Sequence, residues 1–144
     1  MMVWRLDSVS SGVAEAFRGA SPVARRQAAL VACERAVSAT GLEGAFVDGA
    51  LLALRGTVGG TDATRITLQE LAARLDDDYL QVDADGDESR KAEALRCFSK
   101  ARAASALAFG LSPDSGSLHE AIYEAIAALE DPAELLRVVG DALR

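Results

Sequence analysis

The chain has 144 residues, of which 22 are acidic and 15 are basic, so its net charge at neutral pH is −7. Half of the residues are hydrophobic but only 5% are aromatic, which favours a core of close-packed Ala, Leu and Val on helices over a sheet rich in β-branched and aromatic residues. This length fits a single domain, residues 1–144, and the absence of a run of about 18 apolar residues excludes a typical membrane span.

The first third of the chain predicts three helices. Apolar residues at helical spacing predict a short helix over 9–19. Ser21 followed by Pro22 is a typical helix start. The serine side chain can cap the first turn, and proline is tolerated in that turn because the amide hydrogen it lacks would have no acceptor within the helix. Gly41 predicts the end of that second helix. Residues 42–55 are nearly apolar all round, so we expect a third helix that is buried.

A flexible loop rich in glycine and threonine is expected near 56–66. Its pair Gly59 and Gly60 suggests comparison with phosphate-binding loops, but no G-K-[ST] follows and no strand precedes it, so we interpret it as a connection. Thr67 and Glu70 have the spacing of a capping box and predict that the next helix starts there.

An acidic connector is expected near 76–88, a window without a single Lys or Arg. Its second half resembles a calcium loop, but aligning Gly86 with the sixth position of an EF-hand places Gln81 first and Ala92 twelfth, so two essential carboxylates are missing. The connector is therefore interpreted either as solvated chain before a helix or as a partner-binding surface. Its acids are Asp76, Asp77, Asp78, Asp83, Asp85, Asp87 and Glu88.

The stretch 88–111 predicts a long central helix. Its first half is charged, whereas residues 103–112 carry no charge, which is the pattern of a helix that enters a core. Arg102 lies where the charges stop, so we expect its guanidinium to be paired or to reach outward from the rim of the core. Small residues recur along one side and allow another helix to approach closely: Ala94, Cys97, Ala101, Ala104 and Ala108.

The last part of the chain predicts two helices joined by a very short corner at Asp131 and Pro132. On the first of them, His119, Glu120, Tyr123 and Glu124 are interpreted as a solvated face, although two carboxylates and an imidazole could do acid–base chemistry. The whole chain is thus expected to form an all-α, compact single-domain array of about six to seven helices, with no significant β-sheet.

Cysteine usage and basic residues indicate a reduced compartment and no nucleic-acid site. Cys33 and Cys97 lie in apolar helical patterns and are interpreted as free core thiols, and no secretory signal opens the sequence, so a cytoplasmic location is expected. One histidine excludes a multi-histidine metal centre, and we expect no metal and no cofactor. A basic cluster follows the seven acids with a single interleaved aromatic, Phe98, which is too few to stack successive bases; its members are Arg90, Lys91, Arg96, Lys100 and Arg102.

These patterns favour a non-catalytic protein-binding module, monomeric or homodimeric, whose acidic segment binds a basic protein surface and neither nucleic acid nor membrane. One concrete version is an immunity- or antitoxin-type inhibitor that masks a cationic active site. The alternative is a helical sensor or carrier that binds a small apolar ligand between its Ala-rich helices, in a cavity lined by Phe46, Phe98 and Phe109. An enzyme that uses His119, Glu120 and Glu124 is the third hypothesis.

Overall fold

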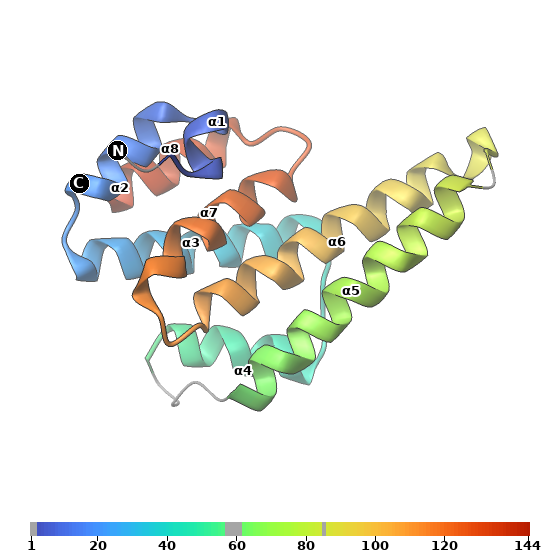
Figure 1. Cartoon of the computed structure of the whole chain (residues 1–144), viewed down its shortest axis with the longest axis horizontal. Helices are drawn as coiled ribbons and strands as arrows, with labels where there is room; N and C mark the ends of the chain where they lie inside the picture. The colour runs from blue at the N-terminus through green and yellow to red at the C-terminus, as the bar shows by residue number, and fades with distance from the viewer. Residues whose placement is uncertain (1–2, 57–61, 85) are drawn as a thin grey trace.

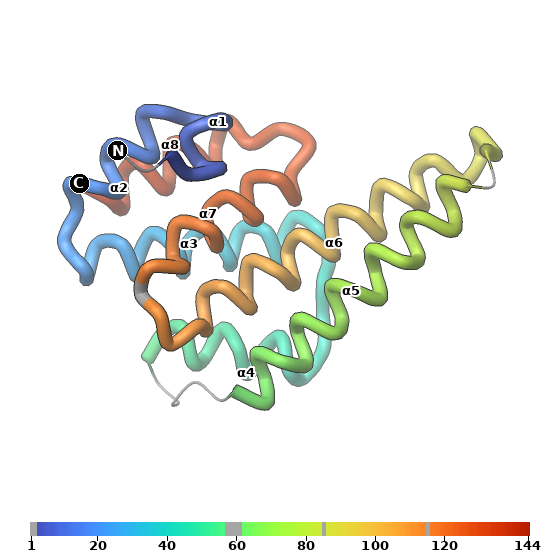
Figure 2. Tube along the Cα trace, viewed as in Figure 1, coloured from blue at the N-terminus to red at the C-terminus, as the bar shows by residue number. Residues whose placement is uncertain are grey.

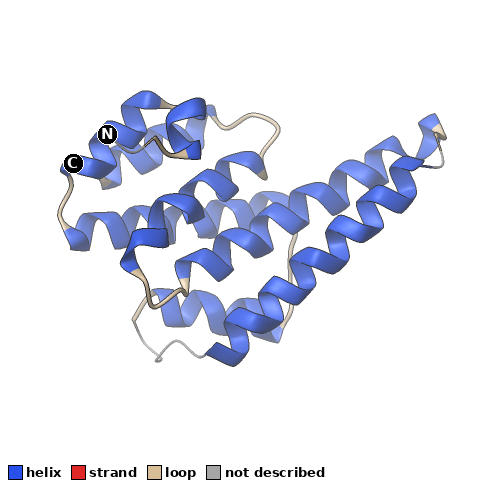
Figure 3. Cartoon of the chain, in the orientation of Figure 1, coloured by secondary structure: helices blue, strands red, loops and turns tan. Residues whose placement is uncertain are grey.

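A computed structural model of the chain describes residues 3–56, 62–84 and 86–144 (Figure 1). Within these ranges the chain is helical and contains no strand, so the all-α prediction is confirmed (Figure 3). The described ranges hold eight α-helices, where about six to seven were expected. The described helices are α1 (Arg5–Val9), α2 (Ser11–Gly19), α3 (Pro22–Thr40), α4 (Ala45–Leu54), α5 (Asp62–Ala84), α6 (Lys91–Gly110), α7 (Leu118–Ala127) and α8 (Ala133–Ala142), with short 3-10 helices η1 (Glu88–Arg90) and η2 (Ser115–Ser117).

Helix α3 lies at the centre of the body, where it packs against α4, α6, α7 and α8 (Figure 2). Its start and end are those the sequence predicts. The Ser21 hydroxyl accepts a hydrogen bond from the Ala24 amide at 3.1 Å, and Gly41 closes the helix in the left-handed conformation with a φ of 72°. The inward face of α3 is built mainly from alanines, so neighbouring helices can approach it closely.

The second half of α6 is the most deeply buried stretch of the chain. Six residues between positions 101 and 108 are at most 5% exposed, and only the side that carries Arg102, Ser105 and Phe109 is less buried. The six are Ala101, Ala103, Ala104, Ala106, Leu107 and Ala108. The prediction that this uncharged half enters the core is therefore confirmed. Helices α3 and α7 pack on it and complete the enclosure.

The first half of α6 leaves the body together with the end of α5. The two helices run side by side, and their joined ends extend beyond the other helices (Figure 1). We call residues 76–100 the acidic arm. Among its described residues only Val82 and Ala94 are buried. The interior of the arm also holds a contact between the rings of Tyr79 and Phe98, whose centroids are 5.6 Å apart.

The start of α5 and the burial of α4 differ from the predictions. Residues 62–66, expected in the flexible loop, belong to α5, while residues 57–61 lie outside the described part. Helix α5 begins before Thr67, whose hydroxyl donates to the Ala63 carbonyl at 2.9 Å instead of capping a helix. The expected burial of α4 was also wrong, because only Val47 and Ala50 of that helix are buried and Leu52 is 42% exposed.

Candidate functional site

Three acids of the acidic arm lie exposed on its surface. The side chains of Asp77, Asp78 and Asp83 are exposed, and none of them takes part in an ion pair with a described residue. All three lie on α5, so the connector expected near 76–88 is helical as far as Ala84. Because the backbone there is helical and already hydrogen-bonded, these carboxylates are not required to hold the chain locally and are available to other molecules.

The other acids of the predicted set have local partners or are not described. Asp87 accepts hydrogen bonds from the amide and the hydroxyl of Ser89, both at 2.9 Å, and these bonds lower the pKa of Asp87. Glu88 pairs with Lys91 at 3.2 Å, and Asp85 lies outside the described residues. Asp76 turns toward the body and contacts Arg102 at 2.6 Å. Among the described acids of the predicted set, Asp76, Asp87 and Glu88 thus differ from Asp77, Asp78 and Asp83 in already having a partner within the chain.

The arm is also less negative than its acidic window alone suggests. Residues 76–100 contain eight acids and four bases, so they contribute −4 of the net charge of −7. The four bases come from η1 and α6, which fold back beside the acids of α5. Two leucines, Leu80 and Leu95, are 60% and 61% exposed on the same arm. The surface is thus a mixture of carboxylates and isolated apolar side chains.

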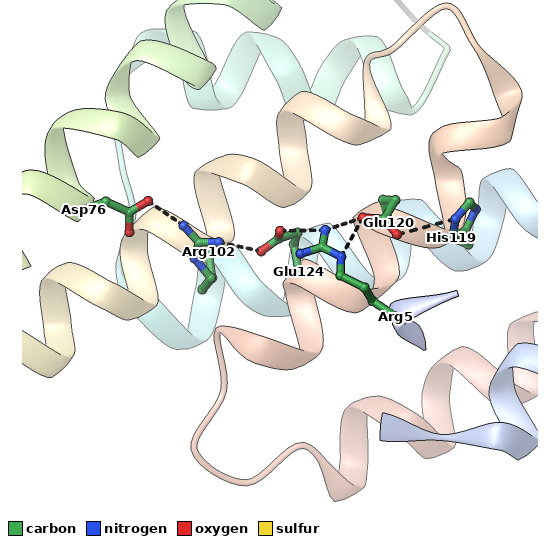
Figure 4. A network of polar contacts seen from close by, with 6 residues as sticks. All are labelled: Arg5, Asp76, Arg102, His119, Glu120 and Glu124. Atoms are coloured by element: carbon green, nitrogen blue, oxygen red, sulfur yellow. Dashed lines mark hydrogen bonds and ion pairs between the residues drawn. The ribbon is translucent and has the colours of Figure 1, made fainter. Parts of the chain in front are cut away.

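At the base of the arm, a chain of ionic contacts links four helices (Figure 4). Asp76 of α5 contacts Arg102 of α6, and Arg102 in turn contacts Glu124 of α7 at 3.1 Å. Glu124 also accepts from Arg5 of α1 at 3.1 Å. Arg5 donates further to Glu120, one turn earlier on α7, through its Nε at 3.0 Å. We call these five residues the ion-pair network, and it connects the root of the arm to the amino-terminal helix.

Glu124 is the buried centre of this network. It is 3% exposed and is the only buried charged residue among those the structure describes. Its two oxygens face different guanidinium groups, Oε2 toward Arg102 and Oε1 toward Arg5. A buried carboxylate is tolerated only with such partners, since an unpaired charge at that depth is costly. The ion-pair network therefore holds α1, α6 and α7 together.

The predicted solvated face of α7 was wrong for this reason. Glu124 is buried and His119 is only 13% exposed at its side chain. The sequence carried one indication that a buried acid was present. Arg102 is the last charge before an uncharged stretch, so its guanidinium was expected to be paired or to reach outward, and in the structure it is paired with Glu124. Nothing in the spacing of α7 alone identified Glu124 as the partner.

His119 lies at the outer end of the same helix and is covered by the amino-terminal segment. Its ring stacks on Trp4 with centroids 4.0 Å apart, and the Arg18 guanidinium covers the Trp4 ring at 4.2 Å. Asp7 holds Arg18 through two hydrogen bonds of 2.9 and 2.6 Å, and this guanidinium lowers the pKa of Asp7 to about 2. The segment is therefore fixed on α7 by stacking as well as by charge.

Protonation of His119 should destabilise this end of the molecule. Burial lowers the pKa of His119 below its ordinary value of 6.5, ahead of an opposing effect from Glu120. The folded state therefore resists the proton that the unfolded chain accepts, so the contribution to stability is complete above pH 6.5 and decreases as the pH falls. We expect the thermal midpoint to fall between pH 7.5 and pH 5.5, with less of a fall in His119→Gln. Because the chain has one histidine, an identical pH dependence in this variant would assign the effect to other groups.

The buried carboxylate of Glu124 and the buried thiol of Cys33 are poorly suited to proton transfer and nucleophilic attack. Both oxygens of Glu124 already accept from arginines, so it is poorly placed to take a proton from a substrate. Burial raises the pKa of Cys33 to about 12, which disfavours a nucleophilic thiolate, and neither Cys33 nor Cys97 forms a disulfide. Within the described ranges, no group of three or more His, Cys, Asp or Glu side chains is placed to hold a metal ion.

The three phenylalanines that were expected to line one ligand cavity are dispersed. Phe98 packs on Tyr79 in the arm, whereas Phe46 and Phe109 are half-buried at the edge of the main core. A pocket whose lining is apolar except for Arg25, Arg26 and Ser112 opens elsewhere, between the ends of α3, α4 and α6. The apolar-ligand hypothesis therefore has a possible place in the molecule, but not the predicted one.

Scans against the models of protein families, the curated proteins and the solved structures each gave no significant match to this chain. In the part of the chain that the structure describes, none of the helices combines the length and the apolar character needed to span a bilayer.

Proposed function

We propose that this chain is a non-catalytic protein-binding module whose acidic arm binds a basic surface of another protein. The observation that carries this proposal is that free carboxylates lie on a two-helix projection that contributes only two buried residues, Val82 and Ala94, to the packing of the molecule. A surface that the fold does not need for stability is free to be used for recognition.

The chemistry of the arm suits a protein partner better than other partners. Its charge of −4 repels nucleic-acid phosphates and anionic lipid, and it attracts a cationic surface over a distance of about 10 Å at moderate ionic strength. Exposed Leu80 and Leu95 supply apolar area between these charges. Such a combination, with apolar contacts among steering charges, is typical of protein–protein interfaces.

An inhibitor of the immunity or antitoxin type is the concrete form that we propose. A narrow projecting arm can enter a concave cationic site, and a small acidic domain of 144 residues is large enough to present it on a stable body. We also propose a cytoplasmic location. The two free cysteines support it, because disulfides are rare in that reducing compartment.

The test compares partner capture by the native chain and by Asp77→Asn, Asp78→Asn, Asp83→Asn combined. The chain is immobilised, the partner is captured from its native lysate at low salt, and the captured protein is identified by mass spectrometry. We expect the triple variant to lose most of the captured protein, because three exposed charges that steer association are removed. Its thermal midpoint should stay within about 2 °C of the native value, since exposed surface substitutions change stability little.

A matched control removes three exposed acids from the body, by combining Glu15→Gln, Glu43→Gln and Asp48→Asn. It changes the net charge by the same amount and should keep the partner. Equal loss of the partner in both variants would mean that only net charge matters. Equal retention in both would remove the acidic arm from the interface.

A further inference from the structure

A pocket of about 330 Å³ opens on the body, where the start of α3 meets the ends of α4 and α6. Its volume lies at the lower end of the range of small-molecule sites. The apolar part of its lining comes from all three helices and the start of α7, and includes Ala29, Ala53, Leu54, Leu111 and Leu118. The lining residues come from the body, and none of them belongs to the acidic arm or the ion-pair network.

The charge of this lining is opposite to that of the chain as a whole. Acids outnumber bases by 22 to 15 in the sequence, yet the pocket is lined by two arginines, Arg25 and Arg26, and by no carboxylate. The dipoles of the bordering helices oppose one another, because α3 presents its N-terminus and α6 its C-terminus. The positive charge of the pocket therefore comes from the two guanidinium groups.

The two arginines differ in how they are held. Arg25 donates from Nε to the Phe17 carbonyl at 2.8 Å and from Nη2 to the Arg18 carbonyl at 2.7 Å, and its guanidinium lies over the Phe17 ring. Two carbonyl oxygens at the C-terminal end of α2 orient this group, and it forms no ion pair with a carboxylate of the described residues. Arg26 is exposed and has no hydrogen bond or ion pair with any described residue. One cation is thus fixed beside the pocket, and the second has no partner in the described part of the chain.

We propose that this pocket binds a small amphipathic anion, a short aliphatic chain that ends in a carboxylate or a phosphate. The chain would fill the apolar part, where Leu54, Leu111 and Leu118 remove it from water, and the head group would meet Arg25 and Arg26. A cation of the same shape is rejected by the same arginines. This function is independent of the acidic arm.

The test is a titration of the isotope-labelled chain, followed by amide chemical shifts, with octanoate, octyl phosphate, octylamine and acetate. Shifts should move at Ala29, Leu54, Gly110 and Leu111 with either octyl anion, and whichever binds more tightly identifies the head group. Octylamine should cause no saturable change there, and acetate should bind more weakly because it lacks the chain. Equal binding of octylamine, shifts spread over the acidic arm, or no saturation by either octyl anion in the millimolar range would overturn the proposal.

Two variants place the ligand in the pocket. Arg26→Gln should weaken octanoate binding about fivefold, the effect of losing one exposed charge partner. Arg74→Gln serves as the matched control, because it removes an exposed arginine of α5 that does not line the pocket. This variant should bind octanoate as the native chain does. Ala53→Phe should fill the pocket and abolish binding while the thermal midpoint shows that the chain still folds. If Ala53→Phe unfolds, the comparison of Arg26→Gln with Arg74→Gln tests the proposal instead. Equal affinities of these two variants for octanoate would contradict the proposed site.

Discussion

Replacing Glu124 by alanine is expected to lower the free energy of unfolding by about 2 to 4 kcal/mol. The carboxylate is 3% exposed, and its removal leaves Arg102, whose side chain is 20% exposed, with Asp76 as its remaining ionic partner. Arg102 already has one buried Nε without a hydrogen-bond partner, so a further loss leaves more of its guanidinium unsatisfied. Urea denaturation of the native chain and the variant measures this difference.

Glu120→Ala is the matched control for this prediction, because Glu120 belongs to the same helix and the same ion-pair network. It contacts Arg5, whose side chain is 48% exposed and solvated, so its loss should cost about 1 kcal/mol or less. Similar losses in the two variants would mean that burial of Glu124 does not decide the energetics of the network.

Ala104→Leu is expected to destabilise the fold by about 1 to 3 kcal/mol through overpacking. Ala104 is fully buried in α6, between helices that approach closely because the side chains between them are small. The added atoms can be accommodated only by displacing the helices that pack on α6, since a close-packed interior has no room for them. The midpoint of denaturant unfolding should fall accordingly.

The same substitution at Ala92, in the first half of the same helix, provides the control. Ala92 is exposed on the outer half of α6, and alanine and leucine have similar helix propensities, so Ala92→Leu should change stability by less than about 0.5 kcal/mol. A midpoint for Ala104→Leu as little changed as that of Ala92→Leu would place Ala104 outside the core.

The division of α6 into an exposed half and a buried half could be predicted because charge patterning reports directly on solvation. Charges occur as far as Arg102 and then cease, and the structure buries the helix from that point. The start and end of α3 were predictable for a similar reason, since Ser21, Pro22 and Gly41 act through local backbone geometry.

The partners of charged side chains could not be predicted, because they depend on how distant helices are placed. Glu124 looks like any surface acid along α7, and only the approach of α1 and α6 makes it the centre of the ion-pair network. The burial of α4 was overestimated because an apolar sequence permits burial but does not supply a covering neighbour. Asp76 likewise differs from Asp77 only in facing Arg102.

Hydrogen–deuterium exchange of the chain with and without its captured partner tests the central claim most directly. If the acidic arm is the recognition surface, residues 76–100 exchange readily in the free chain and gain protection in the complex, while residues 101–110 of the same helix are protected in both. Protection that appears only on the body, with the exchange of residues 76–100 unchanged on binding, would contradict the account.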